Sequence, residues 1–139
     1  MDDPVFPVCS PALLRGDRPI EHPADLLKHT LLHDDYQIDW AAWFAAAGVK
    51  GAEAGRGPRY TDSALLLQAA MEGHGVALAR KVLAADDLAA GRLLRPFDTE
   101  LPGTHAYHLV APPHYCARPK VKAFRDWLFA EAGHGEREP

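Results

Sequence analysis

The sequence has few cysteines, no long apolar run and no excess of basic residues, and each shortage excludes a class of protein. Its two cysteines, Cys9 and Cys116, are too few for a disulfide framework and too far apart for a zinc site. No apolar run reaches the roughly 18 residues that are needed to cross a bilayer. With 15 Lys and Arg against 19 Asp and Glu, the net charge is −4. We therefore expect no DNA contact by this chain, because a DNA-binding surface needs clustered basic residues.

The remaining composition is that of an ordinary folded domain. Hydrophobic residues make up 47% of the 139 residues and charged residues 24%, which argues against a disordered or collagen-like chain. The first four residues, Met-Asp-Asp-Pro, carry negative charge, whereas a secretory signal begins with positive charge. These features predict a cytoplasmic protein of one domain whose thiols are reduced.

The sequence shows no catalytic or metal-binding constellation. It has eight histidines, but none of them has an HExxH or CxxC companion, so we expect no metal ion and no cofactor. Gly73-His74-Gly75 follows a predicted helix and precedes a predicted strand, which indicates a helix end and not a phosphate-binding loop. The adjacent carboxylates Asp34 and Asp35 point in different directions on a strand or a helix. These observations argue against an enzyme.

Strand and helix patterns alternate through most of the chain. Short apolar runs predict strands over 5–9, 30–33, 76–79, 93–96 and 106–110. Helical spacing, caps and terminal glycines predict helices over 23–28, 39–48, 62–73, 82–90 and from 119 onward, and a short helical turn after a cap at Ser10. Strands that alternate with helices indicate an α/β fold with a mainly parallel sheet.

The apolar positions of the predicted helices indicate where the core lies. Four apolar residues follow the helix cap at Asp62 or Ser63 at helical spacing: Leu65, Leu66, Ala69 and Ala70. Three tryptophans lie at amphipathic positions and are expected in the core: Trp40, Trp43 and Trp127. The last helix carries an apolar stripe made of Val121, Phe124, Leu128 and Phe129. Such a stripe rarely stays in water, so we expect the rest of a subdomain or a second copy of the chain to cover it.

The best local candidate for a ligand contact is the segment Arg59–Ser63. It joins a predicted strand end to a helix start, where free backbone N–H groups and the positive end of the helix dipole favour a carboxylate. In parallel α/β sheets, ligands bind beyond the carboxyl ends of the strands. Thr61 and Ser63 add hydroxyl groups, and Arg59 adds charge. The alternative is that Thr61 or Asp62 only caps its own helix.

Several segments occur in an order and spacing that resemble a known family. They are Val5–Leu14, Pro23–His33, Arg56-Gly-Pro-Arg-Tyr-Thr-Asp-Ser63, Gly73–Leu78, Leu83–Leu93 and Arg118–Leu128. Together they resemble the effector-binding domain of LysR-type transcriptional regulators, and most of all the subgroup of the glycine cleavage system activator. The resemblance extends to about residue 132.

The resemblance implies a periplasmic-binding-protein type II-like fold that is mostly one Rossmann-like subdomain. Residues 1–103 correspond to the second effector-binding subdomain, 104–132 to the returning strand and helix of the first, and 133–139 to a polar tail. Full-length family members begin with a winged helix-turn-helix domain, which this sequence does not show. DNA contact would come only through that missing N-terminal domain.

The resemblance also implies a function and a set of contact residues. The chain would be the inducer-binding portion of a regulator, binding a small anionic effector and controlling transcription in the full-length context, as a homodimer away from membranes. The implied effector contacts are Thr61, Asp62 and Ser63 with Tyr60 before them, and more weakly Ser10 and the adjacent His33 and Asp34. Three alternatives stay open, namely a stand-alone small-molecule binding protein of the same fold, an inactive truncated gene product and a small α/β enzyme.

Overall fold

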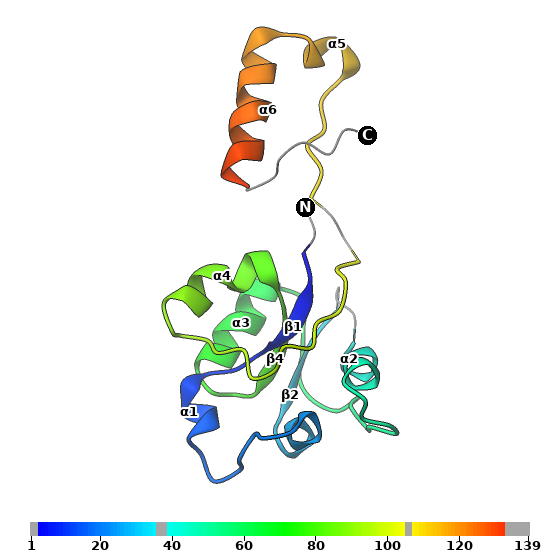
Figure 1. The fold of residues 1–139 in the computed structure, drawn as a ribbon, viewed down its shortest axis with the longest axis vertical. Helices are drawn as coiled ribbons and strands as arrows, with labels where there is room; N and C mark the ends of the chain where they lie inside the picture. Colours follow the sequence, from blue (N-terminus) through cyan, green and yellow to red (C-terminus); the bar gives the residue numbers. More distant parts are fainter. Residues whose placement is uncertain (1–2, 36–38, 105–106, 133–139) are drawn as a thin grey trace. The chain divides into compact units, whose positions relative to one another are not determined.

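The computed structural model describes residues 3–35, 39–104 and 107–132. Residues 3–104 form one compact unit, and residues 107–132 belong to a second unit (Figure 1). The first unit contains β1 (Val5–Val8), α1 (Pro11–Leu14), the 3-10 helix η1 (Pro23–Lys28), β2 (Leu31–Asp34), α2 (Trp40–Ala46), β3 (Arg59–Tyr60), α3 (Ser63–Met71), β4 (Val76–Arg80) and α4 (Lys81–Ala89). The second contains α5 (Pro113–Cys116) and α6 (Pro119–Glu131).

The first unit is built on a four-stranded mixed sheet with the strand order β1-β4-β2-β3. β4 runs parallel to β2, and β2 runs parallel to β3. β1 is the antiparallel edge strand, with Val5 opposite Arg80 and Val8 opposite Ala77 on β4. The structure thus confirms the predicted α/β fold with a mainly parallel sheet, and adds one edge strand that runs the other way.

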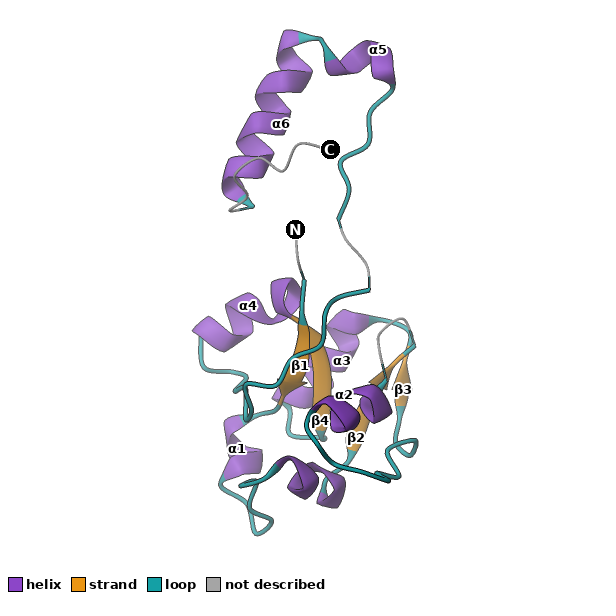
Figure 2. Ribbon diagram, turned by 45° about the vertical axis from the view of Figure 1, so that its right-hand side comes forward, coloured by secondary structure: helices purple, strands orange, loops and turns teal. Residues whose placement is uncertain are grey.

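Helices cover both faces of this sheet. Alternate strand residues point to opposite faces, so that Phe6 and Val8 join one core cluster with α3, while Val5 and Cys9 join another with α2 and η1. Figure 2 shows α3 and α2 on the two sides of the strands. Since both faces are buried, β1 and most of β4 are continuous apolar runs, as in doubly covered sheets.

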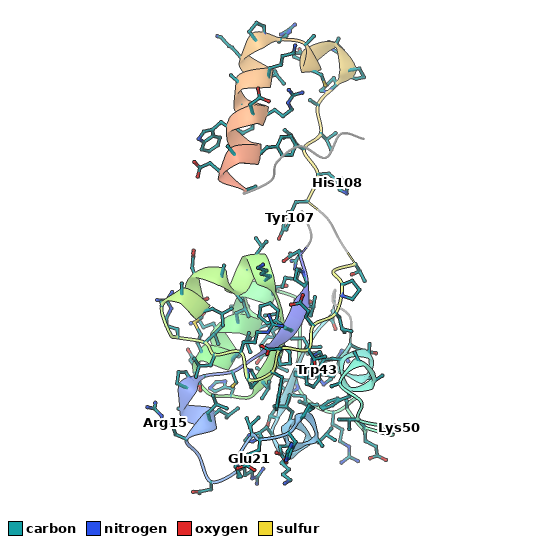
Figure 3. All side chains as sticks on the ribbon, in the orientation of Figure 1. Arg15, Glu21, Trp43, Lys50, Tyr107 and His108 are labelled. Carbon is teal, nitrogen blue, oxygen red and sulfur yellow. The ribbon has the colours of Figure 1, made fainter. Side chains whose placement is uncertain are left out.

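An aromatic cluster fills the core between α2 and the sheet. Trp40, Trp43 and Phe44 are buried. The rings of Trp40 and Trp43 pack edge to face, with their centroids 5.7 Å apart. Both indoles donate hydrogen bonds, Trp40 Nε1 to the carbonyl of Leu32 and Trp43 Nε1 to that of Thr99, each at 3.0 Å. Figure 3 shows Trp43 inside this unit. The core placement predicted for these two tryptophans is confirmed.

Two aspartates begin helices in this unit as the sequence predicts. Asp39 accepts a hydrogen bond from the N–H of Ala42 at the start of α2, and Asp62 accepts one from the N–H of Ala64 at the start of α3. The predicted face of α3 is wrong at one position, because Leu65 is 56% exposed while Leu67 is buried. Three consecutive leucines at 65–67 give no polar contrast, so spacing alone could not select the buried pair.

Two predicted strands and one predicted cap differ in the structure. Residues 93–96 form no strand and make only the bridge between Leu94 and Cys9. Ala106 lies outside the described residues, and residues 107–110 form no strand. A strand needs a hydrogen-bonded neighbour, and no strand is described in the second unit, over 107–132. Ser10 stands at the cap position of α1, but its side chain makes no capping bond.

The second unit is helical, and of the predicted apolar stripe Phe124 and Phe129 are exposed while Val121 and Leu128 are half-buried. None of the α6 residues is buried, and Trp127 is 57% exposed, so its predicted core placement is wrong. Trp127 is exposed because, over the described residues 107–132, α6 has only the single turn of α5 as a neighbouring element of its unit. The polar tail predicted over 133–139 lies outside the described residues.

The two cysteines differ in their surroundings. Cys9 is buried in the core and Cys116 is exposed, and neither forms a disulfide. Burial raises the pKa of the Cys9 thiol to about 11, because a thiolate is poorly solvated there. The thiol of Cys9 therefore stays protonated and unreactive at neutral pH.

Asp25, in the first turn of η1, makes the stability of the first unit depend on pH. The Asp25 carboxylate accepts hydrogen bonds from the backbone N–H groups of His22 and Glu21, which lower its pKa, and Lys28 adds to the effect. Its stabilising contribution is present above the pKa of the unfolded chain, about 3.9, and is lost as the pH falls through the lower folded value. We expect Asp25→Asn to lower the melting temperature at pH 6, with the difference from wild type vanishing towards pH 2. A difference that persists at pH 2 would contradict this, and Asp17→Asn, an exposed carboxylate, serves as the control.

Candidate functional site

The carboxyl ends of the three parallel strands meet at one edge of the sheet. Asp34 ends β2, Tyr60 ends β3 and Arg80 ends β4. The start of α3 follows β3 after two residues, and α4 follows β4 directly. We call this the carboxyl edge. In α/β sheets it is the edge beyond which ligands bind.

The start of α3 holds the predicted contact residues at this edge. Thr61 and Asp62 are exposed, Tyr60 is half-buried against the core cluster on the α3 face, and Ser63 is half-buried. Asp62 Oδ1 accepts from the N–H groups of Ala64 (2.8 Å) and Leu65 (3.4 Å). The helix thus caps itself, as in the alternative reading of this segment, and the structure brings Tyr60, Thr61, Asp62 and Ser63 together at one place.

Asp34, which the resemblance implied together with His33 as a weaker contact, is the partner of Ser63. Ser63 Oγ donates a hydrogen bond of 2.5 Å to Asp34 Oδ2. His33 points to the other face of β2, where it is buried and its Nε2 donates to the carbonyl of Arg56 at 3.0 Å. Strand alternation favours Asp34 over His33 as this partner. Asp34 follows Leu32 by two residues, so both side chains point to the face of the sheet that α3 covers.

A pocket of about 220 Å³ opens beside Asp34 at the carboxyl edge. Its lining residues are Leu32, His33, Asp34, Asp35, Asp39, Trp40, Arg59 and Leu78. Arg59 Nε donates to Asp35 Oδ1 at 3.0 Å across this pocket. Three carboxylates and one guanidinium line this pocket, so it offers hydrogen-bond acceptors as well as a cationic group.

Ser10 lies at the other edge of the sheet. It follows β1, and because β1 is antiparallel to β4, its carboxyl end lies with the amino ends of the parallel strands. Ser10 is buried, and its Oγ lies close to Gly73, beyond the end of α3, since a Cβ added there would be 3.5 Å from it. The structure thus does not bring Ser10 to Thr61 and Ser63. Its contact with an effector stays a prediction.

A second cavity, of about 360 Å³, also lies at the amino ends of the strands. It is lined by Leu27, His29, Thr30, Leu31, Glu53, Arg56 and Gly57. None of the predicted contact residues lines it. Among the described residues, no cluster of three or more His, Cys, Asp or Glu side chains could hold a metal ion.

Solved structures with the same architecture are effector domains of transcriptional regulators. The effector domain of AmpR from Pseudomonas aeruginosa matches with a TM-score of 0.70 and 31% identity, over 96% of this chain and 63% of that one. The AmpR effector-binding domain from Citrobacter freundii matches with a TM-score of 0.72 and 26% identity, over 94% and 64%. The fold is therefore of the periplasmic-binding-protein type II class, as predicted.

Comparison with protein families assigns residues 1–133 to the family described as "LysR substrate binding domain". This chain belongs to that family. The glycine cleavage system transcriptional activator of Escherichia coli K12 is 43% identical over 128 residues, and the transcriptional activator AmpR of Citrobacter koseri is 39% identical over 127 residues. The chain spans 42% of the length of each of these relatives. The resemblance stated from the sequence is confirmed.

The helices of the structure are too short or too polar to cross a membrane, over the residues that it describes. The longest of them, α6, has 13 residues, and a spanning helix needs about 20.

Proposed function

We propose that this chain is the inducer-binding portion of a LysR-type transcriptional regulator and that the effector binds at the carboxyl edge. The observation that carries the proposal is the pair Ser63–Asp34 beside the pocket, at the edge where α/β sheets bind ligands. The curated relatives are transcriptional activators, which supports a binding role in the cytoplasm and not a catalytic one.

The charges at the carboxyl edge support an effector that carries both an anionic group and a hydrogen-bond donor. Arg59 and the hydroxyl of Thr61 suit a carboxylate, whereas the one O–H of Ser63 is donated to Asp34. Asp34 and Asp35 can only accept hydrogen bonds when ionised, so a bare anion beside them would be repelled. A small carboxylate with an ammonium or hydroxyl group satisfies both sets. The anionic effector expected from the resemblance is thereby narrowed to a class with a donor.

The proposed site predicts which substitutions weaken binding. We expect a thermal-shift screen of amino acids and hydroxy acids to give at least one stabilising compound. Ser63→Ala and Asp34→Asn should each weaken its binding by about 10- to 100-fold in calorimetry, because a hydrogen bond to a charged group contributes roughly 1.5–3 kcal/mol.

Asp86→Asn, on the exposed side of α4, is the matched control and should leave the affinity unchanged. A compound that binds equally well to Ser63→Ala, Asp34→Asn and wild type would place its site elsewhere. If no amino acid or hydroxy acid shifts the melting temperature, the proposed effector class is wrong.

We also propose that the chain forms a homodimer through α6. Its exposed apolar side chains, which include Phe124, Trp127 and Phe129, each contribute roughly 1.5–3 kcal/mol when buried. A second copy can bury them along an isologous helix pair. We expect a dimer in sedimentation at micromolar concentration and a monomer for the double variant Phe124→Glu/Trp127→Glu. A wild-type chain that sediments as a monomer would refute the dimer.

A further inference from the structure

The first and last segments of the first unit lie side by side. Val5 and Leu101 form an isolated bridge with two backbone hydrogen bonds, of 2.9 and 2.8 Å. Beyond this bridge, Gly103 packs so closely on Asp3 that an added Cβ would lie 2.2 Å from the Asp3 carbonyl oxygen. We call residues 3–5 and 101–103 the connecting segments, because the chain enters and leaves the unit through them (Figure 1).

The Asp3 side chain joins these segments to α4. Its Oδ1 accepts a hydrogen bond of 2.9 Å from the N–H of Val82, and the carbonyl of Pro4 accepts one of 2.9 Å from the N–H of Lys81. The residue at the cap position of α4, Arg80, makes no capping bond with its side chain. Asp3 therefore supplies from a distant part of the chain the acceptor that helix starts require. Figure 2 shows the start of α4 beside the start of β1.

The same helix start borders the candidate site. Arg80 and Leu83 line a small cavity together with Asp34 and Ser63. The first turn of α4 thus lies between the proposed effector contacts on one side and Asp3 on the other. A ligand that moves Asp34 or Ser63 therefore acts on side chains at the beginning of α4.

Asp3 is held in an environment that costs free energy. It is 2% exposed, and among the described residues its Oδ2 has no hydrogen-bond partner although its Oδ1 does. A buried carboxylate oxygen without a donor is destabilising. The acceptor for the N–H of Val82 is what Asp3 contributes, and an asparagine at this position would keep it.

We propose that Asp3 is a positioning residue that fastens the start of α4 to both connecting segments, so that the three move as one body. Contact at the carboxyl edge is then passed to the connecting segments through α4. This last step rests on the proposed function, whereas the fastening itself does not. A simple cap, by contrast, would stabilise α4 and leave the bridge between Val5 and Leu101 unaffected.

Amide hydrogen exchange of the full chain, followed by NMR without any ligand, separates the two possibilities. In Asp3→Ala, we expect exchange at least about tenfold faster at Val82 and also at Val5 and Leu101. The bridge between Cys9 and Leu94, at the other end of β1, has the same two backbone hydrogen bonds and should keep its wild-type rates. Asp3→Asn should stay close to wild type at all of these amides, because it retains the acceptor.

Asp39→Ala is the matched control variant, since Asp39 caps α2 with a bond of 3.0 Å to Ala42. It should speed exchange at Ala42 and leave both bridges unchanged. If Asp3→Ala affects only the first turn of α4, Asp3 is a helix cap and the fastening is refuted. Faster exchange at both bridges would mean general destabilisation and would refute it as well. Since no effector is used, these outcomes are independent of the binding test with Ser63→Ala.

Discussion

Replacing Trp43 by alanine is expected to lower the free energy of unfolding of the first unit by about 3–5 kcal/mol, the usual cost of deleting a buried large aromatic side chain. Trp43 is fully buried and contacts the rings of Trp40, Phe44 and Phe97. Its loss leaves a cavity between α2 and the sheet and removes the hydrogen bond to the carbonyl of Thr99. Urea unfolding followed by circular dichroism measures the change.

Two further variants show where this free energy comes from. Trp43→Phe keeps a ring in the cluster but loses the Nε1 donor to the half-buried carbonyl of Thr99, so we expect an intermediate loss of about 1–3 kcal/mol. Trp127→Ala removes an exposed indole in the second unit and should leave the unfolding of the first unit unchanged. Equal losses for Trp43→Ala and Trp127→Ala would contradict the described core.

A methyl group at Gly57 is expected to cost about 3 kcal/mol, because it combines backbone strain with a steric clash. Gly57 has a φ of +137°, which side chains rarely adopt, and its added Cβ would lie 1.9 Å from the carbonyl oxygen of Leu31. The loop must therefore separate from β2 in Gly57→Ala. This weakens the nearby bond between His33 Nε2 and the carbonyl of Arg56.

Gly55→Ala is the control for this effect. The added Cβ at Gly55 meets no atom within 4 Å, so its melting temperature should equal or slightly exceed that of wild type. Because Gly57 precedes β3 and the start of α3, Gly57→Ala should also weaken the binding of any effector found for the wild type. If Gly57→Ala were as stable as Gly55→Ala, the loop would not pack on β2 as described.

Local patterns were sufficient to predict most of the fold. The apolar runs and the aspartate caps predict β1, β2, β4 and every described helix except the single turn α5, because these signals depend on residues close in sequence. Leu65 and Leu67 were confused because consecutive leucines carry no periodic contrast. The strand predicted over 106–110 has the correct composition, but pairing depends on a neighbour that no local pattern supplies.

Only the continuous part of the candidate site was predicted, because the rest depends on residues that are far apart in the sequence. The segment from Tyr60 to Ser63 is continuous, so its placement follows from the strand and the helix that it joins. The partner of Ser63 comes from another strand, and with both faces of β2 buried, the sequence did not distinguish Asp34 from His33. The position of Ser10 depends on the direction of β1, which is a property of the whole sheet.

The direction of β1 also brings the two ends of the first unit together. Because one edge strand runs against the other three, the first and last segments of this unit lie at the same edge of the sheet, with residues 5 and 101 hydrogen-bonded to each other. A short linker could close these two points into a ring at little cost in chain entropy. New termini could then be opened in an exposed loop such as the one around Gly51. A fold of this kind can be inserted into another protein, exchanged between relatives or circularly permuted without changing its core.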